Sequence, residues 1–322
     1  ASVLGGGDQP ARARAAFLLG EIARMEGDAQ AARAHFTLLM QIEDGLLAAD
    51  RGDPVAARWY ARGRGRIAEL DAAAGDQARA RSGAEGALAM LRATASQIGE
   101  PPVLAADLAD AELRLAVLEL DAGEPNSARR RAGEAIGRYE ALAVTEKDEP
   151  HWRDMLARAW TLAAQAAFAA GAGADAREAM DKALHARIGL AARYAEEAWA
   201  LAATWRVRVG LLAGLGDASG AEDSLHQAAA LARRMHERAP DQEPPARFLV
   251  HTLVEQADLA LRTSENARAR DAADAARALA QRFAATGAAG WCGEAAAAWD
   301  RLGEVCRRAN ATPKQTQDAF AR

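Results

Sequence analysis

The chain has 322 residues, of which half are hydrophobic, 26% are charged and only 5% are aromatic. Its formal net charge of −5 gives no general attraction to nucleic acid or to an anionic membrane surface. No stretch approaches the length of about 18 uninterrupted apolar residues that would predict a membrane span. Alanine is abundant, and because it is the best helix former, the composition indicates an all-α protein.

The first predicted elements are two helices joined by a tight turn. Residues 1–9, which include three consecutive glycines, are expected to form a flexible lead-in. A helix is predicted from about Pro10 to Met25, and a second helix ends at about Asp50. Between them stands Gly27, followed by an aspartate. Glycine accepts the left-handed conformation that ends a helix, and aspartate is a strong N-cap for the next one.

The same turn recurs along the chain at a fixed interval. Gly27, Gly75, Gly123 and Gly171 are each 48 residues apart, and the same interval separates the arginines Arg33, Arg81, Arg129 and Arg177. The next two turns fall at Gly216 and Ser264, 45 and 48 residues further on. A fixed period of this size predicts a solenoid of stacked helix pairs.

Two places depart from the regular punctuation. An acidic residue followed by proline opens four of the repeats, at Asp53-Pro54, Glu100-Pro101, Glu149-Pro150 and Glu243-Pro244. This pair is absent near residues 193–195, where the period shortens, which predicts a tighter junction in the form of one nearly continuous helix. After Gly290, a seventh outer helix is predicted over 291–308, and the polar segment 312–322 is expected to cap the last hydrophobic face. The interpretation is a single solenoid domain over residues 10–311.

The first repeat resembles the tetratricopeptide repeat (TPR) family. The residues that carry the resemblance are Leu19, Gly20, Ala23, Gly27, Ala32, Phe36 and Leu39, and later repeats keep the pattern more loosely. The period of 48 departs from the family's usual unit of 34 residues, so each helix is expected to have about 20 residues. HEAT-type solenoids have periods nearer 48 and remain an alternative for the fine geometry. The resemblance implies a right-handed α-solenoid of about six long TPR-like helix pairs with a C-terminal capping helix.

By the same resemblance, the concave face of the first helices is expected to bind a protein or peptide partner. The residues expected on that face are Arg14, Glu21, Arg24, Arg62, Glu69, Asp110, Arg158, Gln165, Arg206, His251 and Asp258. Arginine binds carboxylates through two parallel hydrogen bonds, so an acidic or C-terminal segment is the expected ligand. The alternative is that these arginines only pair with neighbouring carboxylates.

Two other groups of residues allow both a binding and a structural interpretation. The run 58–66 is basic and contains Trp59, so it could bind a phosphate, a nucleic-acid strand or an acidic peptide. The acidic chain favours the simpler interpretation, in which Trp59 packs inward and the arginines form a solvated helix face. Trp152, Trp160, Trp199 and Trp205 are expected in the core, and an aromatic wall along a groove is the alternative.

The sequence indicates no catalytic, metal or cofactor site. The six histidines form no metal-binding pair, the carboxylates are expected to be solvated, and no phosphate-binding loop is present. Cys292 and Cys306 would lie roughly 21 Å apart on one helix, beyond disulfide reach. We therefore expect two free thiols and a cytoplasmic location, with a mature periplasmic or secreted form as the alternative.

The expected function is a non-catalytic scaffold that binds a protein or peptide. The alternative is the sensor or regulatory region of a larger signalling protein whose effector domain lies outside this chain. No cofactor, nucleic acid or membrane span is expected, and the oligomeric state cannot be read from the sequence.

Overall fold

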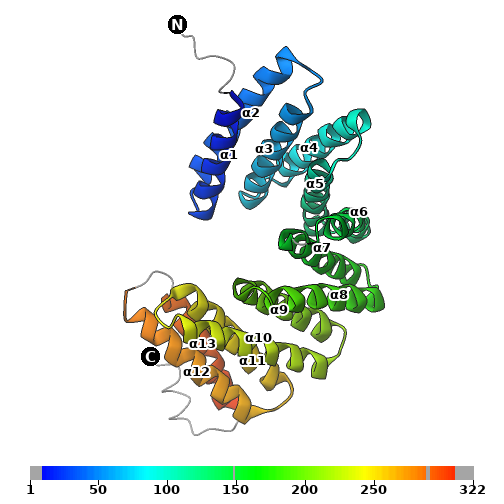
Figure 1. The fold of residues 1–322 in the computed structure, drawn as a ribbon. Coiled ribbons are helices and arrows are strands. Elements are labelled where there is room, and N and C mark those ends of the chain that lie inside the picture. The colour runs from blue at the N-terminus through cyan, green and yellow to red at the C-terminus, as the bar shows by residue number, and fades with distance from the viewer. Residues whose placement is uncertain (1–8, 148, 288–290, 309–322) are drawn as a thin grey trace. The chain divides into compact units, whose positions relative to one another are not determined.

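The computed structural model describes residues 9–147, 149–287 and 291–308, which form thirteen α-helices, one short 3-10 helix and no strand (Figure 1). The helices are α1 Gln9–Met25, α2 Ala29–Ala49, α3 Pro54–Ala73, α4 Gln77–Ile98, α5 Pro102–Asp121, α6 Pro125–Thr145, α7 Pro150–Ala169, α8 Gly173–Ala191, α9 Ala198–Gly214, α10 Ala218–Arg238, α11 Glu243–Arg262, α12 Asn266–Ala284 and α13 Trp291–Arg308. The all-α solenoid predicted from the sequence is confirmed.

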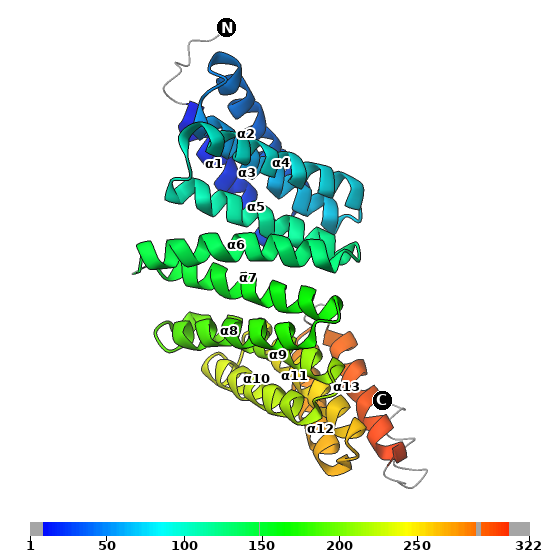
Figure 2. The same cartoon turned by 90° about the vertical axis from the view of Figure 1, so that its right-hand side faces the viewer.

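The helices fall into two compact units, the first ending at Ala183 and the second beginning at Leu184. In the first unit each of α1 to α6 packs against the helix that follows it, as Figure 2 shows for α6 and α7. Among the first helices, α5 also contacts α3 and α7 of the neighbouring repeats. In the second unit α9 to α13 pack in the same sequential way, and α11 contacts α13 directly. First helices therefore lie next to first helices within each unit.

The turns explain the regular spacing of glycine. Gly27 has a φ of 81°, which favours glycine, and the amide of Asp28 donates to the carbonyl of Ala23 at 2.9 Å in the manner of a Schellman motif. The Asp28 carboxylate then accepts from the amide of Ala31 and caps α2. In the sixth turn Ser264 adopts a φ of 65°, so the turn geometry survives without glycine.

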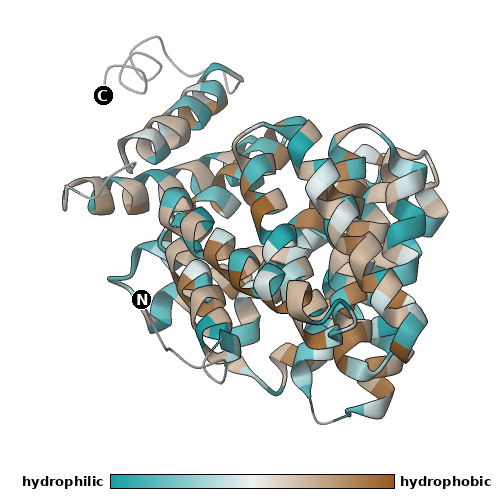
Figure 3. Cartoon of the chain, turned by 90° about the horizontal axis from the view of Figure 1, so that it is seen from above, coloured by the Kyte–Doolittle hydropathy of each residue, from teal (hydrophilic) through white to brown (hydrophobic). Residues whose placement is uncertain are grey.

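Small side chains allow the paired helices to approach closely. The alanines that follow the six turns are all fully buried: Ala32, Ala80, Ala128, Ala176, Ala221 and Ala269. Gly20 has the same role in the first pair, because a Cβ atom there would lie 2.5 Å from the ring of Phe36. Hydrophobic and hydrophilic residues are mixed along the helices (Figure 3).

The junction between the fourth and fifth pairs is not a continuous helix, so this expectation is wrong. Helix α8 ends at Ala191, Tyr194 is extended with φ −127° and ψ 108°, and the 3-10 helix Ala195–Glu197 precedes α9. Arg187, which is only 4% exposed, forms an ion pair with Glu197 at 3.2 Å across this break. A polar contact therefore joins α8 to the 3-10 helix at the junction that lacks an acidic residue and proline. The predicted lead-in up to residue 8 and the capping segment 312–322 lie outside the described residues.

We predict that Gly20→Ala destabilises the first helix pair by about 1–3 kcal/mol, because the new methyl group would overlap Phe36. Thermal and urea unfolding would measure the change. The matched control is Gly45→Ala in α2, where no atom lies within 4 Å of the new Cβ. The control should be neutral or stabilising by up to about 1 kcal/mol. Equal melting temperatures for the two variants would show that the Gly20 contact is unimportant.

Candidate functional site

The candidate binding surface is the first-helix face, which we define by the residues that the sequence analysis assigned to it. In the first unit they lie on α1, α3, α5 and α7, and in the second unit on α9 and α11. Most of the charged members form ion pairs, many of them between neighbouring first helices. The structure therefore separates members that hold the repeats together from members that face solvent.

Asp107 of α5 joins two arginines of α3. Its side chain is 2% exposed, and it accepts hydrogen bonds from Nε of Arg58 and Nε of Arg62, both at 2.7 Å. The side chains of Arg58 and Arg62 are only 16% and 31% exposed. The expectation that the basic run forms a solvated face is therefore wrong, because the run makes buried contacts with the next repeat.

A second chain of ion pairs links α1, α3 and α5. Glu21 lies 2.8 Å from Arg66, which also contacts Glu69, and Arg114 donates to Glu69 at 2.5 Å. Burial alone would raise the pKa of Glu69, but Arg114 and Arg66 outweigh it and lower that pKa. Arg114 also lies 3.8 Å from Asp110. Three of the predicted residues, Glu21, Glu69 and Asp110, therefore belong to one network that fixes the stagger of three repeats.

The same chain reaches the second helix α6. The hydroxyl of Tyr139 donates to Asp110 at 2.5 Å, and Tyr139 is fully buried. Burial and the neighbouring Asp110 raise the pKa of Tyr139, so the phenol stays protonated and remains a donor. Asp110 is thus held from two sides.

The predicted residues of the second unit are also paired. Arg206 of α9 forms an ion pair with Glu255 of α11 and lies 5.2 Å from the centre of the Phe248 ring. His251 lies 3.0 Å from Glu294 of α13, and Asp258 lies 2.7 Å from Arg301 of α13. Burial raises the pKa of Asp258, although Arg301 opposes the shift.

Arg206 does not share the register of Arg14, Arg62 and Arg158, although the sequence analysis assigned all four to the first-helix face. Arg158 lies 13 residues before its turn at Gly171, whereas Arg206 lies only 10 residues before Gly216. Because this repeat is 45 residues long, the position equivalent to Arg158 is Ala203. Arg206 therefore lies three residues beyond that position, or about 60° around the helix.

Four predicted residues remain at or near the surface. Arg14 and Gln165 are exposed, and the side chain of Arg158 is 62% exposed and forms an ion pair with Asp154, one turn away on α7. Arg24, 39% exposed, pairs with Glu21 on its own helix. These four residues are the part of the first-helix face that a ligand can reach without breaking a contact between repeats.

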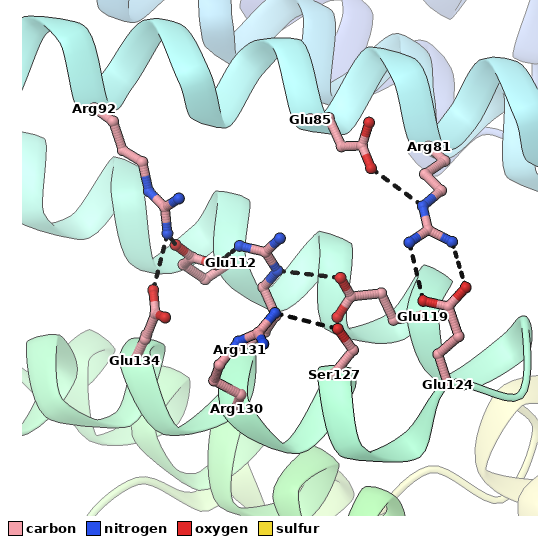
Figure 4. A network of polar contacts seen from close by, with 10 residues as sticks. All are labelled: Arg81, Glu85, Arg92, Glu112, Glu119, Glu124, Ser127, Arg130, Arg131 and Glu134. Atoms are coloured by element: carbon pink, nitrogen blue, oxygen red, sulfur yellow. Dashed lines mark hydrogen bonds and ion pairs between the residues drawn. The ribbon is translucent and has the colours of Figure 1, made fainter.

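A buried polar network also lies between α4, α5 and α6, contrary to the expectation of solvated carboxylates (Figure 4). Glu112 is fully buried and accepts from Arg92 at 2.6 Å and from Arg131 at 3.0 Å. Arg131 also donates to Glu119, which is 3% exposed, and Arg92 also donates to Glu134. Burial and the neighbouring Glu134 raise the pKa of Glu112, against the opposing effect of the arginines. We call these five residues and the pair Arg81–Glu124 the central network.

The repeat register contained a signal for the buried acids. Glu119 and Asp71 stand four residues before their turns, as does Ala23, a buried residue of the TPR-like pattern. Likewise Glu43 stands at the position of Leu91 and Tyr139, both buried. Counting from each turn would therefore have identified these carboxylates as core residues.

Glu43 is the least compensated of these carboxylates. It is 2% exposed and forms no hydrogen bond or ion pair with another described residue. Burial, with a smaller contribution from Asp53, raises its pKa to about 7, and the nearby positive charge of Arg14 opposes the shift.

No group of histidine, cysteine and carboxylate side chains that could hold a metal ion occurs among the described residues. The side chains of Cys292 and Cys306 lie outside the described part of the chain. Within that part, no helix is long and apolar enough to cross a membrane.

We predict that Asp107→Asn destabilises the first unit by about 2–4 kcal/mol, because it leaves two partly buried arginines without a counter-charge. The control is Asp175→Asn, which removes an ion pair to Arg129 whose side chains are 51% and 44% exposed. We expect the control to cost less than about 1 kcal/mol in chemical unfolding. A similar loss in both variants would contradict the structural role assigned to Asp107.

We also predict that Glu43 makes stability depend on pH. The raised pKa means that the folded chain keeps a proton that the unfolded chain releases between the ordinary value of 4.5 and about 7. Stability should therefore fall as the pH rises through this window. Glu43→Gln should be more stable than the natural chain by about 1–3 kcal/mol at pH 8, and the difference should vanish near pH 4.

Thermal melts across this pH range would test the Glu43 prediction. Glu140→Gln, at an exposed position of α6, is the control and should leave the profile unchanged. A Glu43→Gln profile parallel to that of the natural chain would refute it.

Comparison with known proteins shows the fold. No protein-family model and no curated protein sequence matches the chain. The crystal structure of BtubC (BKLC) from P. vanneervenii is similar, with a TM-score of 0.60 and 18% identity over 80% of this chain and 91% of that one. The TPR-like repeats of a putative kinesin light chain from Podosopora anserina give a TM-score of 0.51 and 16% identity over 71% of this chain and 98% of that one. NprR in complex with its cognate peptide NprX gives a TM-score of 0.52 and 14% identity over 99% of this chain and 79% of that one. The chain therefore has the fold of a TPR-like helical-repeat solenoid.

Proposed function

We propose that the chain is a non-catalytic scaffold that binds a polypeptide on its first-helix face. The observation that carries this proposal is that the charged residues on that face have two different roles. Glu21, Glu69 and Asp110 are committed to contacts that fix the repeats, while Arg14 and Arg158 stay exposed. A surface fixed in this way binds with a small entropic cost, because its backbone need not be ordered by the ligand.

The ligand chemistry follows from the residues that face solvent. Arg14, Arg158 and Gln165 belong to the same unit and can donate hydrogen bonds. Arginine favours carboxylates, which it contacts with two parallel hydrogen bonds. The proposed ligand is therefore an acidic or C-terminal peptide segment, and the complex of NprR with the peptide NprX supports peptide binding on this kind of fold. We extend the proposal to a cytoplasmic location.

Arg62 is removed from the set of proposed ligand contacts. Its Nε is bonded to the buried Asp107, so replacing it would disturb the contact between α3 and α5. A loss of binding in an Arg62 variant would not separate recognition from folding. The exposed pair Arg14 and Arg158 avoids this problem.

The test is selection from a displayed library of peptides with free C-termini, followed by affinity measurement with synthetic peptides. We predict that Arg14→Ala combined with Arg158→Ala lowers the affinity of the selected peptides about ten-fold, or about 1.4 kcal/mol. The melting temperature should not change, because both side chains are exposed. Amidation of the peptide C-terminus should weaken binding by a similar factor.

The matched control is Arg79→Ala combined with Arg130→Ala, which removes two exposed arginines from the second helices α4 and α6. This variant should bind the selected peptides as the natural chain does. Failure of the folded protein to select any peptide would contradict the proposal, as would equal losses in the two double variants.

A further inference from the structure

A cavity of about 330 Å³ lies between α10, α11 and α12 in the second unit. We call it the α11 groove, because the second helices α10 and α12 form its walls and α11 forms its floor. It occupies the place in the repeat that the central network occupies between α4, α5 and α6. The comparison follows from the turns, because Gly75 and Gly123 correspond to Gly216 and Ser264, which stand 141 residues later.

At the centre of the groove, charged residues of the central network are replaced by apolar ones. The equivalent pairs are Glu112 and Leu253, Glu119 and Ala260, Arg131 and Ala272, and Glu134 and Ala275. All four of the replacing residues line the cavity. In the central network, these side chains fill the space between the helices with ion pairs (Figure 4). In the second unit, the space is open and its floor is apolar.

The rim of the groove remains polar. Arg268 forms an ion pair with Glu222 at 2.5 Å, and Arg233 lies 3.5 Å from the side-chain oxygen of Gln256. Asp271 also lines the cavity, is exposed, and forms no ion pair with another described residue. Among the described residues, the rim therefore offers one carboxylate, Asp271, and one guanidinium, Arg233, that form no ion pair.

We propose that the α11 groove binds a large apolar side chain of a partner polypeptide that carries a basic residue beside it. The apolar side chain would pack on Leu253, Leu259 and Ala260, and the basic residue would pair with Asp271. Burial of apolar surface provides the attraction, and the carboxylate selects the flanking charge. The equivalent space between α4, α5 and α6 supports this inference, because the side chains of the central network fill it.

This groove is separate from the first-helix face. It lies between second helices, and none of the residues tested for the proposed function lines it. Its proposed ligand is basic, whereas the ligand proposed for the first-helix face is acidic. The two proposals can therefore fail independently.

The probes are dye-labelled, acetylated and amidated hexapeptides, measured by fluorescence anisotropy with the full chain. The first contains adjacent lysine and tryptophan among glycine and serine residues. The second replaces the lysine with serine, and the third replaces the tryptophan with serine. We expect the first peptide to bind at least ten-fold more tightly than either of the others. Equal binding of the three, or no binding of the first, would overturn the proposal.

The decisive variant refills the groove. Ala272→Arg combined with Ala275→Glu restores the residues that the central network has at these positions, and it should reduce binding of the first peptide at least ten-fold. The matched control is Ala267→Arg combined with Ala278→Glu, which makes the same chemical change at exposed positions of α12 outside the groove. Circular dichroism melts would establish that both variants are folded. Unchanged binding in the refilled variant, or an equal loss in the control, would refute the assignment.

A second variant tests the carboxylate. Asp271→Asn should weaken binding of the first peptide about ten-fold. It should leave binding of the second peptide, which lacks the lysine, unchanged. An equal effect on both peptides would contradict the role of Asp271. Sedimentation at several protein concentrations would reveal a second copy of the chain in the groove, and self-association that competes with the peptide would also overturn the proposal.

Discussion

The close approach of paired helices at small side chains is the constraint on which the rest of the structure depends. The alanine after every turn is fully buried, and Gly20 leaves room for the ring of Phe36. Helices that pack at this distance remove the neighbouring positions from solvent, whatever residues occupy them. An acid in such a register is therefore buried, as Asp71 and Glu119 are, and it needs a counter-charge or a proton. One of the arginines that recur every 48 residues meets part of this need, because Arg33 pairs with the buried Asp71. Arg81 and Arg129 instead pair with the exposed Glu124 and Asp175 of the following repeats.

These ion pairs specify alignment more than they add stability. Desolvation offsets most of the attraction in a buried pair, whereas the loss of one partner is costly. A repeat that slipped along its neighbour would leave Asp107 without Arg58 and Arg62, and Glu69 without Arg114. The stagger of α1, α3 and α5 is thus set by polar contacts superimposed on an alanine-rich interface that would tolerate several registers. The consequence is that the first-helix face on α1, α3 and α5 is held in one alignment.

The sequence was sufficient for the features that depend on local physics. The turn glycines, the aspartate caps and the buried alanines follow from backbone conformation and packing, and the structure agrees with them. The partners of the charged residues could not be predicted, because an ion pair such as Arg62 with Asp107 joins residues 45 positions apart on different helices. Register errors had a simpler cause. Applying the period of 48 across the repeat of 45 placed Arg206 where Ala203 belongs. The break before α9 was missed because its stabilising contact, Arg187 with Glu197, has no local signature.

A comparison of two equivalent contacts shows how the repeats diverge. Arg129 pairs with Asp175, and 93 residues later, at the same two positions, Glu222 pairs with Arg268. The charges are exchanged while the contact is retained, so the fold requires complementary charges there and not a particular residue. Positions deeper between second helices are less constrained, because the helices keep the same arrangement whether side chains fill this space or leave a cavity. Arg131 takes the first solution and Ala272 the second. A few substitutions at such positions can therefore turn a structural polar network into an open cavity without changing the helices that surround it.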